Sequence, residues 1–225
     1  MRTALLTVYL ALFLILIGTC YRKSWKAWHV PAKCANSAGF IALLLAGLAL
    51  RGNSAFIYSL LPPFLFCFLG DFFLALCQGK DSRVLLMGGL ASFLMAHILF
   101  IVCFLNLSAF HWTDLIIPSA AVTVTWGLTR LKGMHVKDML PYVLCYAFFV
   151  GLLFSKGLLL AAACKFASGT AWIAAGAFLF FVSDGIILFL YFYEKQWKIG
   201  KFFNLLFYYG GMLYLALSGW YMPAV

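Results

Sequence analysis

Charged residues are scarce in this 225-residue chain, where Asp, Glu, Lys and Arg together make up 10% of the sequence. A soluble domain normally has about a quarter of its residues charged, so this chain lacks the charge needed to cover a water-facing surface. The deficit excludes a soluble enzyme, a coiled coil, a disordered chain and a disulfide scaffold. What the chain has instead is an apolar share of 66%, which predicts a protein embedded in a lipid bilayer.

Acidic residues are the scarcest class, with 6 Asp and Glu against 16 Lys and Arg. Most basic residues stand in short gaps between apolar runs, where they act as topology signals and contact anionic headgroups. We therefore expect membrane lipid, and no nucleic acid, as a partner. The seven cysteines form no CxxC pair and lie in or beside apolar runs, so we interpret them as apolar fillers and expect no metal site.

Eight apolar runs, each near the length of about 20 residues that a spanning helix needs, predict an all-α fold. They cover roughly residues 4–20, 31–50, 55–78, 84–106, 113–129, 139–164, 168–193 and 202–222. We expect one polytopic domain over residues 1–225, a bundle of eight transmembrane helices. No signal-peptidase site follows the first run, so we expect that helix to be retained. Lys156 and Lys165 both stand near the junction of runs six and seven, and we place the turn at Lys165.

Basic residues are concentrated in alternate gaps, which predicts the orientation. The gaps after runs one, three, five and seven hold Arg22, Lys23, Lys26, Lys80, Arg83, Arg130, Lys132, Lys137, Lys195, Lys198 and Lys201, whereas the other side has Arg2, Arg51 and Lys165. The positive-inside rule places the first set in the cytoplasm and both termini outside.

A short internal similarity predicts a duplication. The segment ending in Gly70-Asp71 resembles the one ending in Ser183-Asp184, four spans later. A 4+4 repeat with parallel halves would produce this, and chance similarity between Phe- and Leu-rich helices is the alternative.

Polar residues inside spans are costly and mark candidate sites. Asp71 and Asp184 lie about 10 and 15 Å from the cytoplasmic ends of their helices. Most other polar side chains fall in the same half of the bilayer: Lys33, Asn36, Ser37, Tyr142, Tyr146, Asn204 and Tyr208, with His97 near the middle of its helix. The sequence thus predicts a polar cavity in the cytoplasmic half. Two carboxyl groups sharing it would hold one proton between them, giving a proton donor beside an acceptor, as general acid/base hydrolysis requires.

Other interpretations stay open at this point. A single intramembrane aspartate can pair with a lysine or bond a neighbouring helix, His97 can be a satisfied interior histidine, and Lys33 can be an interfacial anchor. For function, a proton-coupled small-molecule or lipid transporter would use the same buried carboxylates. An intramembrane aspartyl protease is disfavoured because Phe68 stands where its GxGD motif has glycine. A non-catalytic lipid-binding protein is a further alternative.

Several short motifs in order along the chain carry a family resemblance. They are Ala32-Lys33, Leu69-Gly70-Asp71, Phe93 with Ala96-His97, Tyr146, Gly176-Ala177 with Phe180 and Ser183-Asp184, and Tyr208-Tyr209. The chain resembles the YhhN-type lysoplasmalogenases of bacteria and animals from about Pro31 to Ser218. It departs from their pattern at Met212, where Gln is usual, and at Phe100, where Tyr is common. These departures bear on substrate details, since both aspartates are kept.

The resemblance implies hydrolysis of the vinyl-ether bond of a lysoplasmalogen. The products are a fatty aldehyde and glycerophosphoethanolamine or glycerophosphocholine. It implies a lysophospholipid substrate, no metal or organic cofactor, and a place in the bacterial inner membrane. The expected catalytic residues are Asp71 and Asp184. We expect substrate to be bound by Lys33 at its phosphate, helped by Asn36 and His97, and by Tyr146 and Tyr208.

Overall fold

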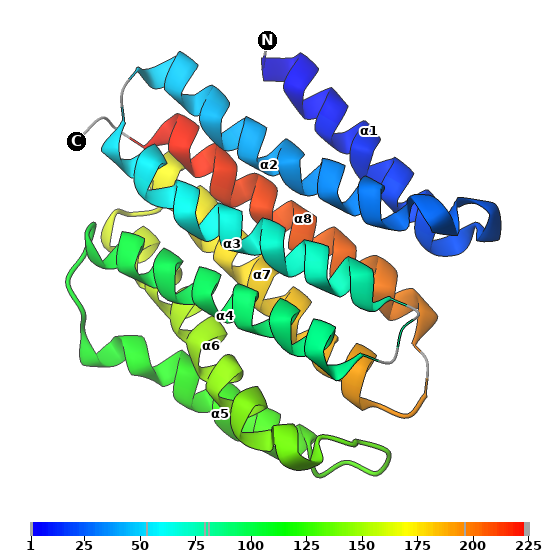
Figure 1. Cartoon of the computed structure of the whole chain (residues 1–225). Coiled ribbons are helices and arrows are strands. Elements are labelled where there is room, and N and C mark those ends of the chain that lie inside the picture. The colour runs from blue at the N-terminus through cyan, green and yellow to red at the C-terminus, as the bar shows by residue number, and fades with distance from the viewer. Residues whose placement is uncertain (1, 53, 79, 81, 196, 223–225) are drawn as a thin grey trace. The chain divides into compact units, whose positions relative to one another are not determined.

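The computed structural model describes residues 2–52, 54–78, 80, 82–195 and 197–222 of the chain. These residues form eight α-helices and no β-strand, which confirms the predicted all-α fold (Figure 1). The helices are α1 (Arg2–Tyr21), α2 (His29–Arg51), α3 (Ala55–Cys77), α4 (Arg83–Leu105), α5 (Ile116–Leu128), α6 (Leu140–Ala163), α7 (Ser168–Phe192) and α8 (Lys198–Tyr221). The side chains of Arg51 and Lys198, both counted in the topology prediction, lie outside the described residues.

Seven of these helices are long and apolar enough to cross a membrane, as expected of a multi-pass membrane protein. The exception is α5, whose 13 residues extend only about 20 Å against a hydrocarbon core of about 30 Å. The fifth apolar run is interrupted near its start, because residues Trp112–Leu115 form a separate 3₁₀ turn, η2. The sequence therefore predicted the eight helices correctly, but its fifth helix is too short to span alone.

The described chain forms two compact units, one up to Leu99 and one from Phe100 to Met222. The boundary falls inside α4, so this one helix contributes residues to both units. Each unit is described by itself below. The expected organisation as a single domain, the 4+4 repeat and the orientation of the termini stay predictions.

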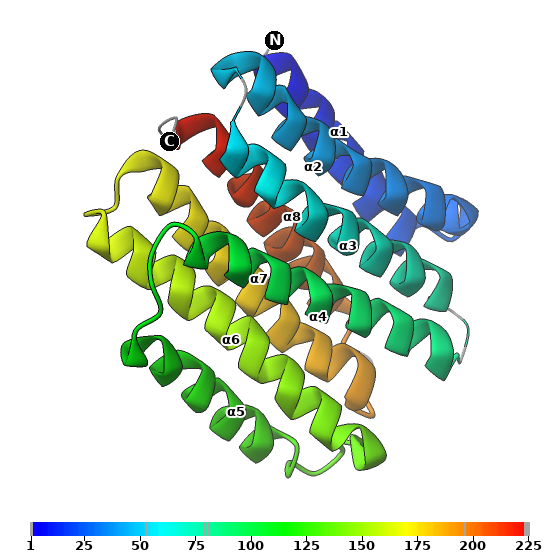
Figure 2. The same ribbon diagram turned by 60° about the vertical axis from the view of Figure 1, so that its left-hand side comes forward.

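In the first unit, α1, α2 and α3 lie side by side, as both ribbon views show (Figures 1 and 2). Tyr9 of α1 is 3% exposed and packs on Gly39 of α2, where an added Cβ would lie 3.1 Å from the tyrosine ring. The Phe40 ring of α2 meets the Phe64 ring of α3 edge-on, with centroids 5.4 Å apart. Aromatic contacts of this kind join α2 to the helix that carries Asp71.

In the second unit, α7 and α8 approach closely through glycine. A Cβ added at Gly176 would lie 2.9 Å from the Gly211 carbonyl oxygen, and one at Gly211 would lie 2.9 Å from the Gly176 carbonyl oxygen. Small residues permit such backbone contact between membrane helices. The turn between α6 and α7 contains Lys165 and Phe166, both with positive φ. The prediction that Lys165 marks this turn is confirmed, and Lys156 lies inside α6.

Two loops of the second unit are joined by backbone hydrogen bonds. Met134, before α6, forms an isolated antiparallel bridge with Tyr193, directly after α7. The His135 amide donates to the Phe192 carbonyl at 2.7 Å, and the Glu194 amide donates to the Gly133 carbonyl at 2.9 Å. The bridge therefore connects the start of α6 to the end of α7.

Candidate active site

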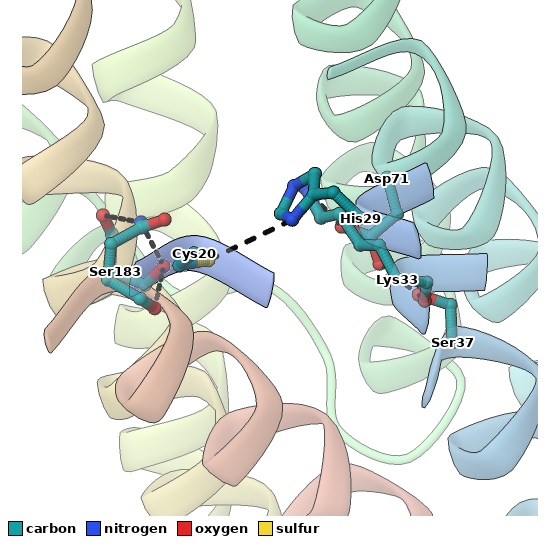
Figure 3. A network of polar contacts seen from close by, with 7 residues as sticks. Cys20, His29, Lys33, Ser37, Asp71 and Ser183 are labelled. Carbon is teal, nitrogen blue, oxygen red and sulfur yellow. Dashed lines mark hydrogen bonds and ion pairs between the residues drawn. The ribbon is translucent and has the colours of Figure 1, made fainter. Parts of the chain in front are cut away.

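Asp71 is the centre of a buried polar cluster between α2 and α3. The Lys33 ammonium lies 3.1 Å from Asp71 Oδ1, and the two side chains are 10% and 1% exposed. The Ser37 hydroxyl lies 2.5 Å from Asp71 Oδ2. Figure 3 shows Lys33 and Ser37 both directed toward Asp71. The i, i+4 spacing of the lysine and the serine puts them on one face of α2, so one helix supplies both of these contacts.

Local packing fixes the position of Asp71 on α3. The preceding residue, Gly70, has no side chain, and an added Cβ would lie 2.7 Å from the ring of Phe93 on α4. Phe93 is 2% exposed, so this ring occupies the space that a larger residue at position 70 would need. The Gly70-Asp71 pair therefore combines a close helix contact with a polar group on the adjacent position.

Two further predicted residues of this unit are fully buried. Asn36, one position before Ser37, is 0% exposed, and neither its amide nitrogen nor its amide oxygen has a hydrogen-bond partner among the described residues. His97 is also 0% exposed and lies one helical turn beyond Phe93 on α4. Lys33, Asn36, Asp71 and His97 are thus all buried polar residues of the first unit, as a polar site in an apolar bundle requires.

Asp184 is the centre of a second polar cluster, in the other unit. The Tyr146 hydroxyl of α6 lies 3.0 Å from Asp184 Oδ2 on α7, and Asp184 is 7% exposed. One turn before Asp184, Phe180 meets the Tyr208 ring of α8 edge-on at 5.4 Å. Of the two tyrosines predicted on one face of α6, Tyr146 reaches the carboxyl, whereas Tyr142 is 59% exposed.

The residue before Asp184 ties α7 to α8. The Asn204 amide nitrogen lies 2.9 Å from both the carbonyl oxygen and the hydroxyl of Ser183. The Ser183 hydroxyl in turn lies 3.2 Å from the Asn204 carbonyl oxygen. These bonds hold α7 in register with α8 beside the carboxyl-bearing position. That Asp71 and Asp184 share a single cavity stays a prediction, because the two aspartates belong to different units.

Sequence reasoning missed a third charged group, the buried pair of Lys156 and Asp114. The Lys156 ammonium lies 3.3 Å from Asp114 Oδ2, and the side chains are 2% and 0% exposed. The same ammonium donates to the Ala109 carbonyl, and Asp114 accepts from the His111 amide at 2.8 Å. A lysine inside an apolar run was the available signal, because such a charge needs a partner in hydrocarbon.

A histidine at the start of α2 was also missed. His29 is 7% exposed, and its Nδ1 lies 2.9 Å from the Thr19 hydroxyl of α1. The same nitrogen lies 3.8 Å from the Cys20 sulfur at the end of α1 (Figure 3). The contact closes the α1–α2 connection. Among the described residues, no group of three or more His, Cys, Asp or Glu side chains lies close enough to hold a metal ion.

Comparison with known proteins gives the family. No curated protein and no solved structure matches the chain. Residues 28–219 match the YhhN family, a match that includes both aspartate clusters and every motif on which the resemblance rested. This stretch covers most of the chain, and the family is of the lysoplasmalogenase type. The chain therefore belongs to the YhhN family.

Proposed function

We propose that this protein is a membrane hydrolase that cleaves the vinyl-ether bond of a lysoplasmalogen. The products are a fatty aldehyde and a glycerophospho-base. The observation that carries the proposal is the burial of two carboxyl groups in apolar helices, each contacted by a polar side chain: Lys33 and Ser37 at Asp71, and Tyr146 at Asp184. A carboxyl group inside a membrane is costly in free energy, so its presence there marks a candidate site of chemistry or proton transfer.

The chemistry of the bond explains the need for two carboxyl groups. A vinyl ether is hydrolysed by protonation at carbon, which yields an oxocarbenium-like cation that water captures. Glycosidases meet a similar demand with two carboxyl groups that divide the acid and base roles. In the proposed reaction one of Asp71 and Asp184 protonates the alkenyl carbon, and the other stabilises the cation and accepts a proton from water.

The remaining site residues are proposed to bind the substrate. The buried amide of Asn36 offers donors and an acceptor to the headgroup region, and His97 adds an imidazole in the same unit. Tyr146 and Tyr208 line the Asp184 side, and the phenylalanine-rich helix faces accommodate the alkenyl chain. Lys33 is the proposed ligand of the substrate phosphate, and its ammonium also lies 3.1 Å from Asp71 Oδ1. We place the enzyme in the bacterial inner membrane with the site in the cytoplasmic half.

The direct test is to incubate the purified protein with lysoplasmalogen and detect free aldehyde. We expect aldehyde release by the wild type and a fall of orders of magnitude in Asp71→Asn and in Asp184→Asn, with both variants still folded in detergent. Near wild-type release by both variants would contradict the carboxyl mechanism. Reconstituted protein that moves a solute across the bilayer and releases no aldehyde would instead identify a transporter.

A further inference from the structure

Asn36 of α2 carries a fully buried amide that the described part of the protein does not satisfy. The side chain is 0% exposed, and neither its nitrogen nor its oxygen has a hydrogen-bond partner among the described residues. Buried polar groups are almost always hydrogen-bonded, because an unpaired one carries the full cost of its desolvation. An amide of this kind inside a candidate site therefore points to a ligand with complementary groups.

Asn36 lies on the part of α2 that contacts Asp71. It stands three residues after Lys33, whose ammonium lies 3.1 Å from Asp71 Oδ1. Residues at this spacing are neighbours on a helix surface, and the rise between them is about 4.5 Å along the axis. The amide is therefore placed about one turn further along the helix than the lysine. All three residues belong to the first unit.

The buried side chains of α2 follow the order of the parts of a single-chain phospholipid. From the lysine onward they are Lys33, Asn36, Ser37, Phe40, Leu43 and Leu44. A cation comes first, hydrogen-bonding groups follow, and apolar side chains come last. In a lysoplasmalogen the phosphate, the sn-2 hydroxyl and the alkenyl chain stand on successive carbons of glycerol in the same order. With the phosphate at Lys33, as proposed, the hydroxyl lies toward the level of Asn36.

Hydrogen-bonding capacity favours the hydroxyl over the phosphate as the ligand of Asn36. A side-chain amide offers two donors on its nitrogen and an acceptor on its oxygen. A hydroxyl has one donor and two lone pairs, so it can donate to the amide oxygen or accept from the amide nitrogen. The phosphate diester of a phospholipid has only acceptors, so it would pair with the nitrogen and leave the amide oxygen buried without a donor.

We infer that Asn36 recognises the sn-2 hydroxyl of the substrate and thereby selects lipids with a single chain. In a two-chain plasmalogen this oxygen is esterified, so it has no proton to donate to the amide, and its acyl chain would have to be accommodated at a fully buried position. The inference rests on the proposed function and deepens it, because it assigns a specificity-determining residue to the same reaction.

The inference can be tested with lysoplasmalogen and its 2-deoxy analogue, in which hydrogen replaces the sn-2 hydroxyl. The quantity to compare is kcat/KM for aldehyde release from the two substrates. We expect the wild type to favour the hydroxyl-bearing substrate by about ten- to a hundredfold, because the deoxy analogue leaves a buried amide unpaired. A wild-type ratio near one would overturn the inference.

Asn36→Leu replaces the amide with an apolar side chain of similar size and should bring this ratio to about one. No amide then remains to disfavour the deoxy analogue, so its kcat/KM should not fall below the wild-type value. Asn106→Leu is the matched control, because Asn106 is exposed in the turn after α4, and it should keep the wild-type ratio. Thermal unfolding in detergent shows whether each variant is folded.

The alternatives give different results. An unchanged ratio in Asn36→Leu would overturn the inference: with KM raised for both substrates it would assign Asn36 to the phosphate, and with KM unchanged it would leave the amide a structural role. If Asn36→Leu does not fold, Asn36→Ala carries the same expectation for the ratio. A wild type that releases no aldehyde from either substrate would refute the proposed function itself, whereas equal release from both would refute only the role of Asn36.

Discussion

Removing the charge of Lys156 should destabilise the second unit without touching either aspartate of the proposed site. The ammonium lies 3.3 Å from Asp114 Oδ2 and also donates to the Ala109 carbonyl. Lys156→Met leaves a carboxylate that is 0% exposed without its counter-charge. Breaking a fully buried pair by removing one partner costs about 3–5 kcal/mol. Asp114→Asn should cost a similar amount, because it leaves the ammonium buried beside a neutral amide.

The double variant makes the reasoning quantitative. With Lys156→Met and Asp114→Asn combined, no uncompensated charge remains, so the loss should be much smaller than the sum of the two single losses. Thermal unfolding in detergent gives the stability of all four proteins of this cycle, which are the wild type, the two single variants and the double variant. Lys132→Met, at an exposed position, is the control for loss of a positive charge. Additive losses in the double variant would refute the idea that the two charges stabilise the fold as a pair.

Two further substitutions test contacts beside the aspartates. Tyr146→Phe removes a hydroxyl from the carboxyl group that it contacts and should lower the rate of aldehyde release about tenfold or more, whereas Tyr142→Phe, at a 59% exposed side chain, should leave the rate unchanged. Gly70→Ala should lower stability by about 1–3 kcal/mol in thermal unfolding, because its Cβ would lie 2.7 Å from the Phe93 ring. At Gly127, an added Cβ would meet no other atom within 4 Å in the described part of the chain beyond its own helix turn, so Gly127→Ala should not lower stability. Equal losses in both variants would contradict the packing argument.

Most of the fold could be predicted because membrane helices have a strong sequence signal. Each must be about 20 apolar residues long, and short polar gaps must separate them. The start of α3 at Ala55 and the turn at Lys165 follow from this rule. The fifth helix was predicted less well, because composition alone does not reveal that the 3₁₀ turn at Trp112–Leu115 shortens it.

The sequence identified residues of the candidate site but not which of their side chains contact one another. Asp71 and Lys33 stood out because charged groups in hydrocarbon are rare. That Lys33 contacts Asp71 depends on how α2 packs on α3, and no local pattern specifies that packing. The pairing of Lys156 with Asp114 was missed for the same reason, because the two residues are 42 positions apart and meet only through the packing of η2 on α6.

The bridge between Met134 and Tyr193 limits how a molecule can reach Asp184. At one end α6 and α7 are joined by the short turn through Lys165, and at the other end this bridge joins them again. Because α6 and α7 are connected at both ends, we expect them not to separate from one another by a hinge motion at either end. We therefore expect a substrate to approach Asp184 across the faces of α6 and α7 and not through the seam between them.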